Sequence, residues 1–172
     1  MDAVIVNIPR MAPSRPSAGT ALIKSLLNNI HVTNQLVDIN IDFFNRFAVQ
    51  YGAEQFQELD RYLYNDNIVL SADTKQSYQQ FLTHWVEHIV AQDSKWVLIS
   101  IFTWQCQNFA RDFITQLRTA TTAKIVIGGQ GMIKSENTSF NEDPYFAKEL
   151  MSAGVIDYYI QGEAEKALPE LL

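Results

Sequence analysis

Two patterns of hydrophobic residues alternate along the chain, and together they predict an α/β fold. Short, continuous apolar runs are typical of strands buried on both faces of a parallel sheet. Such runs occur at residues 3–8, 36–41, 96–102, 124–127 and 156–161. Between them, apolar residues recur at helical spacing, most clearly from Tyr78 to Ile89 and from Phe109 to Leu117. We therefore predict a doubly wound, Rossmann- or flavodoxin-like parallel sheet of five strands in the order 2-1-3-4-5.

Residues 43–67 interrupt the alternation after the second strand. This segment is rich in aromatic residues, and Phe56, Leu59 and Tyr62 recur at helical spacing. We predict an inserted helical segment, for which Asp42 is a candidate cap. A Pro-rich loop at residues 9–19 precedes the first helix, whose cap is either Ser17 or Thr20.

The loops after the third and fourth strands are the first place to look for a ligand site. Ligands bind beyond the carboxyl ends of parallel strands, so residues 103–105 and 128–131 are expected at one edge of the sheet. The hydroxyls of Ser100 and Thr103 are expected to face a shared cavity, or else to bond to backbone and to cap the next helix. Trp104 either offers a flat apolar surface to a ligand or packs under the Pro-rich loop.

Glycines form most of the loop after the fourth strand. Gly128, Gly129 and Gly131 let the backbone approach a ligand closely, although a tight turn at the strand exit explains them as well. Their spacing differs from the dinucleotide and P-loop fingerprints. If a ligand lies there, a Gly129→Val side chain enters its groove and impairs binding more than folding.

Composition and charge limit the number of domains, the binding partners and the location that the chain is expected to have. With 172 residues, 47% of them hydrophobic, the chain is expected to form a single domain over residues 1–172. A net charge of −6 argues against binding to nucleic acid or to an anionic membrane. The apolar runs are too short to span a bilayer, and Pro9 interrupts the first of them too early for a signal peptide. We therefore expect a cytoplasmic protein.

Other chemistry-bearing residues point to structural roles. His84 and His88 are one helical turn apart, as in some metal sites, but a third ligand is missing, so a helix flank is the better interpretation and no metal site is expected. Cys106 is the single cysteine, which excludes an internal disulfide and a cysteine-ligated iron–sulfur cluster in this chain. Asp38 and Asp42 do not follow the first strand, where a phosphorylatable receiver domain needs paired acids.

Four segments resemble the N-terminal cobalamin-binding domain of B12-dependent radical SAM enzymes. They are SIFT, VIGGQG, the Pro-rich loop RMAPSRPSAG and the closing DYYIQGEAEKALPELL. The resemblance covers nearly the whole chain and implies a groove for the nucleotide tail of cobalamin. The implied cofactor-binding residues are Ser100, Thr103, Trp104, Gly128, Gly129, Gly131, Arg15 and Ser17.

Two departures from related proteins refine this expectation. Better-known cobalamin proteins carry an Asp-x-His-x-x-Gly motif in the first loop, and this chain does not. The resemblance therefore implies base-off cobalamin without a protein histidine beneath the cobalt, which changes the reactivity of the metal. The CxxxCxxC motif of radical SAM enzymes is also missing. We expect the [4Fe-4S] cluster and S-adenosylmethionine to belong to a radical SAM domain after Leu172, in a longer methyltransferase or radical rearrangement enzyme. The alternative is a stand-alone binding module.

Two other functions remain open at this stage. One is a flavodoxin-like interaction or regulatory module without a cofactor. The other is a flavin-binding domain, with which the aromatic ring of Trp104 and the hydroxyl of Thr103 are compatible.

Overall fold

The computed structural model describes residues 1–9, 17–65, 67–133 and 143–172. The first half of the described chain contains β1 (Ala3–Asn7), α1 (Ala18–Asn29), β2 (Asn34–Asp38), α2 (Ile39–Phe43), the π-helix η1 (Phe44–Gln50), α3 (Ala53–Tyr64) and α4 (Ala72–Val90). The second half contains β3 (Trp96–Ser100), the 3-10 helix η2 (Trp104–Cys106), α5 (Gln107–Ala120), β4 (Lys124–Gly128), the 3-10 helix η3 (Gln130–Met132), α6 (Tyr145–Ser152), β5 (Tyr158–Ile160) and α7 (Ala164–Leu171).

All five strands of the sheet run parallel in the order β2-β1-β3-β4-β5, which confirms the predicted topology. The register aligns their carboxyl ends. Asn7 pairs with both Asp38 and Ser100, Ser100 pairs with Gly128, and Gly128 pairs with Ile160. These five residues form one row at the edge where parallel sheets bind ligands.

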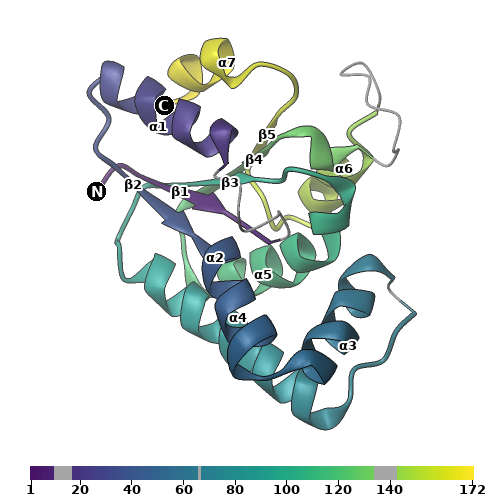
Figure 1. The fold of residues 1–172 in the computed structure, drawn as a ribbon. Helices are drawn as coiled ribbons and strands as arrows, with labels where there is room; N and C mark the ends of the chain where they lie inside the picture. The colour runs from purple at the N-terminus through teal and green to yellow at the C-terminus, as the bar shows by residue number, and fades with distance from the viewer. Residues whose placement is uncertain (10–16, 66, 134–142) are drawn as a thin grey trace.

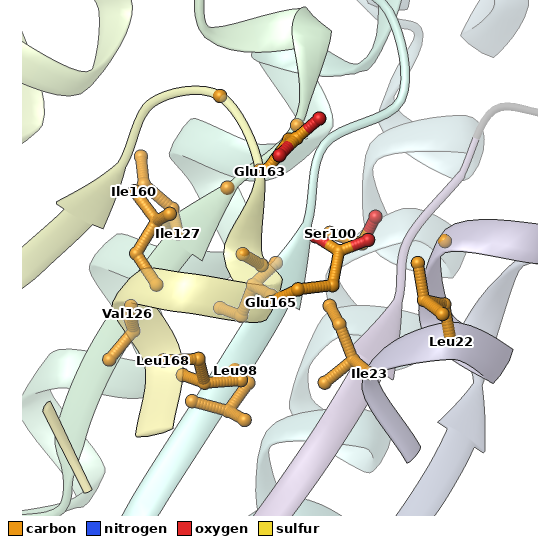
Figure 2. A pocket seen from close by; sticks show the side chains of 16 residues that line it. Leu22, Ile23, Leu98, Ser100, Val126, Ile127, Ile160, Glu163, Glu165 and Leu168 are labelled. Atoms are coloured by element: carbon orange, nitrogen blue, oxygen red, sulfur yellow. The ribbon is translucent and has the colours of Figure 1, made fainter. Parts of the chain in front are cut away.

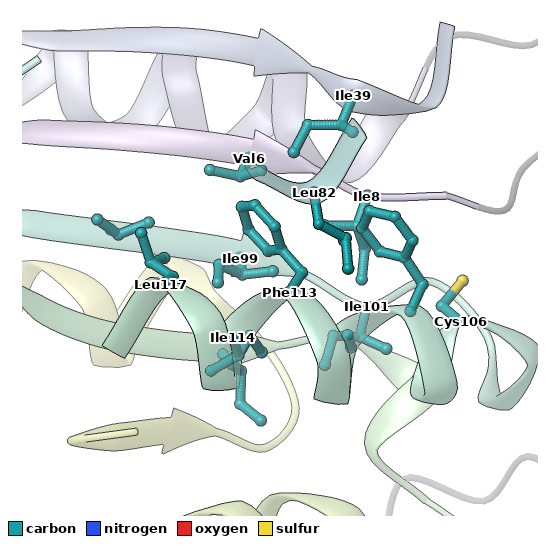
Figure 3. Packing of buried hydrophobic residues seen from close by; sticks show 14 of the residues in the cluster. Val6, Ile8, Ile39, Leu82, Ile99, Ile101, Cys106, Phe113, Ile114 and Leu117 are labelled. Carbon is teal, nitrogen blue, oxygen red and sulfur yellow. The ribbon is translucent and has the colours of Figure 1, made fainter. Parts of the chain in front are cut away.

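Helices cover both faces of the sheet (Figure 1). The helices near the two ends of the described chain, α1 and α7, lie on one face, while α4, α5 and α6 pack on the other. Alternate residues of each strand pack into the hydrophobic cores on the two faces of the sheet, because successive side chains point to opposite faces. Figure 3 shows the larger core, in which Val6 and Ile99 face Phe113 of α5. On the opposite face, Ile5 and Leu98 belong to the smaller core beneath α1 and α7.

The predicted helical insertion is present as α2, η1 and α3. Phe43 lies at its centre and is fully buried. The ring centroids of its aromatic neighbours lie 5.2–6.3 Å from that of Phe43, and these neighbours are Phe44, Phe47, Phe56, Phe81 and Phe109. Because Phe81 and Phe109 belong to α4 and α5, the insertion extends the larger core rather than forming a separate one.

The prediction for the end of the second strand was wrong. The apolar run continues to Ile41, but β2 stops at Asp38, whose Oδ1 accepts a hydrogen bond from the Ile41 amide at 3.1 Å and caps α2. Ile39 is still fully buried, so hydrophobicity alone does not mark the change from strand to helix. Asp42, the predicted cap, instead accepts a hydrogen bond from Trp85 Nε1 at 2.9 Å.

Among the described residues, no helix combines the length and the apolar character that crossing a membrane requires.

Candidate ligand cavity at the carboxyl edge of the sheet

A cavity of about 280 Å³ lies between α1, α7 and the carboxyl-terminal halves of β3, β4 and β5 (Figure 2). Its volume is near the lower limit of small-ligand sites, which is about 300 Å³. It therefore suits a group the size of one ring system better than a whole cofactor. The apolar side chains around it include Leu22, Ile23, Leu98, Val126, Ile160 and Leu168.

Polar groups gather at one end of this cavity. Figure 2 shows Ser100, Glu163 and Glu165 toward one end, and Leu98, Val126 and Leu168 toward the other. Both glutamates are exposed to solvent at the start of α7. The cavity thus has a polar mouth and an apolar interior.

Two glycines keep the cavity open. If Gly19 carried a Cβ, its nearest neighbour would be Ser100 Oγ at 4.0 Å. A Cβ on Gly128 would approach the Ile160 carbonyl oxygen at 3.6 Å, which is an ordinary contact distance. Neither position has the left-handed backbone that requires glycine. Side chains here are tolerated by the backbone, and larger ones would occupy the space between α1 and the sheet.

The loops after β3 and β4 lie at one edge of the sheet, as predicted, and their backbones also contact each other. The Ile101 amide donates to the Gly128 carbonyl at 2.8 Å, and the Gly131 amide donates to the Ile101 carbonyl at 2.9 Å. A Cβ on Gly131 would lie 2.4 Å from the Thr103 carbonyl oxygen. The close approach of the two backbones explains why Gly131 lacks a side chain.

Gly129 lines the cavity, but its lack of a side chain also has a structural cause. Its φ angle is +104°, and a Cβ would lie 2.4 Å from the Ile101 carbonyl oxygen. The expectation that Gly129→Val damages binding more than folding stays a prediction, and the structure adds a cost to folding because the new side chain meets the backbone of the β3 loop.

Thr103 and Trp104 lie outside the described lining of the cavity. Thr103 Oγ1 is 3.7 Å from Sγ of Cys106, which is fully buried at the start of α5. The Trp104 ring meets Tyr64 of α3 edge to face, with 6.2 Å between centroids. Trp104 thus contacts the helical insertion and lies on the same edge of the sheet as the cavity.

The structure decides which residue caps the first helix. Ser17 is buried, and its Oγ accepts a hydrogen bond from the Thr20 amide at 3.4 Å. Thr20 Oγ1 in turn donates to the Ser17 carbonyl at 3.2 Å. Ser17 therefore positions α1 and is outside the cavity lining. Arg15, the other candidate from the Pro-rich loop, lies outside the described residues.

None of the three histidines of the chain is among the residues that line the cavity. His31 follows the far end of α1, roughly 18 Å from Gly19 at 1.5 Å per helical residue. His84 and His88 lie on α4, where their rings are 5.5 and 5.3 Å from that of Trp85. The described part of the chain also contains no group of three side chains that could hold a metal ion.

Sequence reasoning missed the helical side of the cavity. Gly19, Leu22 and Ile23 come from α1, whereas Leu168 comes from α7 at the other end of the chain. The sequence does contain a signal, because the turn at Gly162 and Glu163 opens the last helix next to β5, and both residues line the cavity.

In comparisons with models of protein families and with curated proteins, the chain matches none of them.

Proposed function

We propose that this chain binds a corrinoid and that the cavity holds the base at the end of the nucleotide tail. The observation that carries the proposal is an apolar, ring-sized cavity that Gly19 and Gly128 leave open beside Ser100. The resemblance places the tail at the ends of the third and fourth strands, where Ser100 and Gly128 lie.

The chemistry of the lining supports this assignment. A flat aromatic base loses little when it leaves water for walls formed by Leu98, Val126 and Leu168. At the mouth, the carboxylates of Glu163 and Glu165 are acceptors for N–H groups such as those of the corrin amide side chains. When bound, a corrinoid supplies a cobalt centre that carries and transfers alkyl groups.

The positions of the histidines support a base-off complex. His31 is at the far end of α1, while His84 and His88 belong to a helix on the opposite face of the sheet from α1 and α7. In this proposal the protein leaves the lower face of the cobalt without an imidazole. An altered axial ligand is one of the main ways in which a protein tunes a macrocycle-bound metal.

The proposal assigns binding, and not S-adenosylmethionine cleavage, to residues 1–172. The single cysteine, Cys106, is fully buried, and an iron–sulfur cluster needs several accessible thiolates. We infer a cytoplasmic parent enzyme, a methyltransferase or radical rearrangement enzyme, whose radical SAM domain follows this chain and holds the [4Fe-4S] cluster.

Titration with hydroxocobalamin tests the proposal, with the visible spectrum as the readout. We expect a saturable spectral change for the wild type and at least tenfold weaker binding for Gly19→Trp, which fills the space beside Ser100. The matched control is Ala21→Trp, because Ala21 is exposed on the same helix and outside the lining. Circular dichroism verifies that both variants fold.

Each alternative function gives a different result in this experiment. Saturable binding of flavin mononucleotide, without binding of cobalamin, would replace the proposal with a flavin site. If neither cofactor binds at millimolar concentration, the chain is better described as an interaction or regulatory module. Equal affinity of Gly19→Trp and Ala21→Trp would show that the corrinoid does not use the cavity.

A further inference from the structure

We propose that the cavity selects among corrinoids by the base of their nucleotide tail, favouring benzimidazole over purine bases. This inference rests on the proposed corrinoid function and adds a specificity that the function does not require. It follows from the distribution of polar groups around the cavity.

The apolar end of the cavity offers a bound base no side-chain hydrogen bond within the part of the chain that the structure describes. Leu98 of β3 and Val126 of β4 are neighbours in the parallel ladder, so their backbone amides and carbonyls belong to the sheet. Leu168 of α7 and Ile23 of α1 complete the lining at this end. A ring buried here meets hydrocarbon on all of these sides.

The two kinds of base differ in what they lose on entering such a cavity. Dimethylbenzimidazole presents a hydrocarbon ring and two methyl groups, which gain from burial. Adenine presents an exocyclic amine and additional ring nitrogens, each of which loses a hydrogen bond to water. Burying unpaired donors and acceptors is unfavourable, and sites discriminate strongly on this basis.

The polar residues of the cavity do not remove this difference. Ser100, Glu163 and Glu165 lie toward the mouth, away from Leu98 and Leu168 (Figure 2). A purine could satisfy its amine with these groups by staying near the mouth, but it would then leave the apolar interior unfilled. A purine base therefore loses either hydrogen bonds to polar groups or the burial of its ring in the apolar interior.

Three corrinoids test the inference by equilibrium binding to the wild-type chain: cobalamin, its adenine-containing analogue and cobinamide, which lacks the nucleotide tail. We expect cobalamin to bind at least tenfold more tightly than the adenine analogue and more tightly than cobinamide. Equal affinity for cobalamin and the adenine analogue, or tighter binding of the latter, would overturn the inference. If none of the three binds, the proposed function itself fails.

A substitution inside the cavity sharpens this test. Val126→Thr keeps the side-chain shape and introduces a hydroxyl into the lining, so the preference for cobalamin should fall severalfold. The matched control is Val97→Thr, since Val97 is equally buried but belongs to the core on the opposite face. A preference that changes equally in both variants would show that the base does not contact Val126, while the comparison within the wild type remains decisive if either variant fails to fold.

Discussion

The α-carbon of Gly129 faces the carbonyl oxygen of Ile101 so closely that a Cβ on the glycine would lie 2.4 Å from that oxygen. The φ angle of Gly129 is +104°, a conformation that side-chain-bearing residues rarely adopt. The contact joins the loops after β3 and β4 at the edge of the sheet that carries the cavity.

We predict that Gly129→Ala lowers the free energy of unfolding by more than about 2 kcal/mol, because both the backbone strain and the clash oppose the native loop. Gly154→Ala is the matched control. Its φ angle is +70°, but a Cβ there would meet no atom within 4 Å, so only strain of about 1 kcal/mol is expected. Urea unfolding measures both values, and equal losses would show that the contact with Ile101 is unimportant.

A second prediction concerns Asp157, which holds the amino ends of β4 and β5 together. Its carboxylate accepts hydrogen bonds from Lys124 Nζ at 2.8 Å, the Ile125 amide at 2.9 Å and Arg118 Nη2 at 3.1 Å. We expect Asp157→Asn to lower the free energy of unfolding at neutral pH by about 1–2 kcal/mol, since the side chain is mostly shielded from solvent. Lys124→Met, which removes one exposed partner, should cost clearly less than Asp157→Asn.

The pH dependence of the stability of wild type and Asp157→Asn gives an independent test of this prediction. Burial raises the pKa of Asp157, but the hydrogen bonds from Lys124 and Ile125 and the charge of Arg118 outweigh it and leave the pKa below 3.8. The stabilisation is therefore fully present above pH 3.8 and disappears as the pH falls through the lower, folded-state value. The stability difference between wild type and Asp157→Asn should shrink over this acidic range, and a difference independent of pH would contradict the prediction.

A third prediction concerns Asp112, which joins the insertion to α4 and α5. Asp112 Oδ2 accepts hydrogen bonds from the hydroxyls of Tyr62 at 2.8 Å and Tyr78 at 3.0 Å. Burial, followed by the nearby Asp112 charge, raises the pKa of Tyr78 well above 10.0, so its hydroxyl remains a donor at neutral pH. We expect Tyr78→Phe to lower the free energy of unfolding by about 1.5 kcal/mol.

The control for this prediction is Tyr158→Phe. Tyr158 is 39% exposed on β5, and its ring contact with Trp96 survives the substitution. Thermal unfolding of both variants decides the outcome. Equal melting temperatures would mean that the hydrogen bond from Tyr78 to Asp112 does not stabilise the fold.

The sequence predicts the sheet well because its strands are buried on both faces. Continuous apolar runs such as Val97 to Ile99 have few alternatives to a central parallel strand, and the helical spacing between runs sets the crossovers. The end of β2 was harder to predict, because Ile39 and Ile41 continue the apolar pattern after Asp38 has already capped a helix. Hydrophobic periodicity does not show whether a backbone amide bonds to a neighbouring strand or to a capping side chain.

Part of the cavity lining could be predicted from the positions of the strands. Ser100, Gly128 and Gly129 follow from the rule that ligands bind at the carboxyl ends of parallel strands, and all three line the cavity. Gly19 and Leu168 come from α1 and α7, which are far apart in the sequence, so no local pattern identifies them. Trp104 contacts Tyr64 of the insertion, a tertiary pairing that its position in the sequence does not reveal.

We propose that in the complex the cavity withdraws the nucleotide base from the cobalt and that none of His31, His84 and His88 replaces it. Electron paramagnetic resonance of the cob(II)alamin complex, isolated by gel filtration, tests this most directly because an axial nitrogen splits the cobalt signal. We predict a base-off spectrum without nitrogen splitting, in wild type and in a variant with all three histidines changed to glutamine. A bound cofactor that retains nitrogen splitting, or a chain that leaves the column without cobalamin, would contradict the claim.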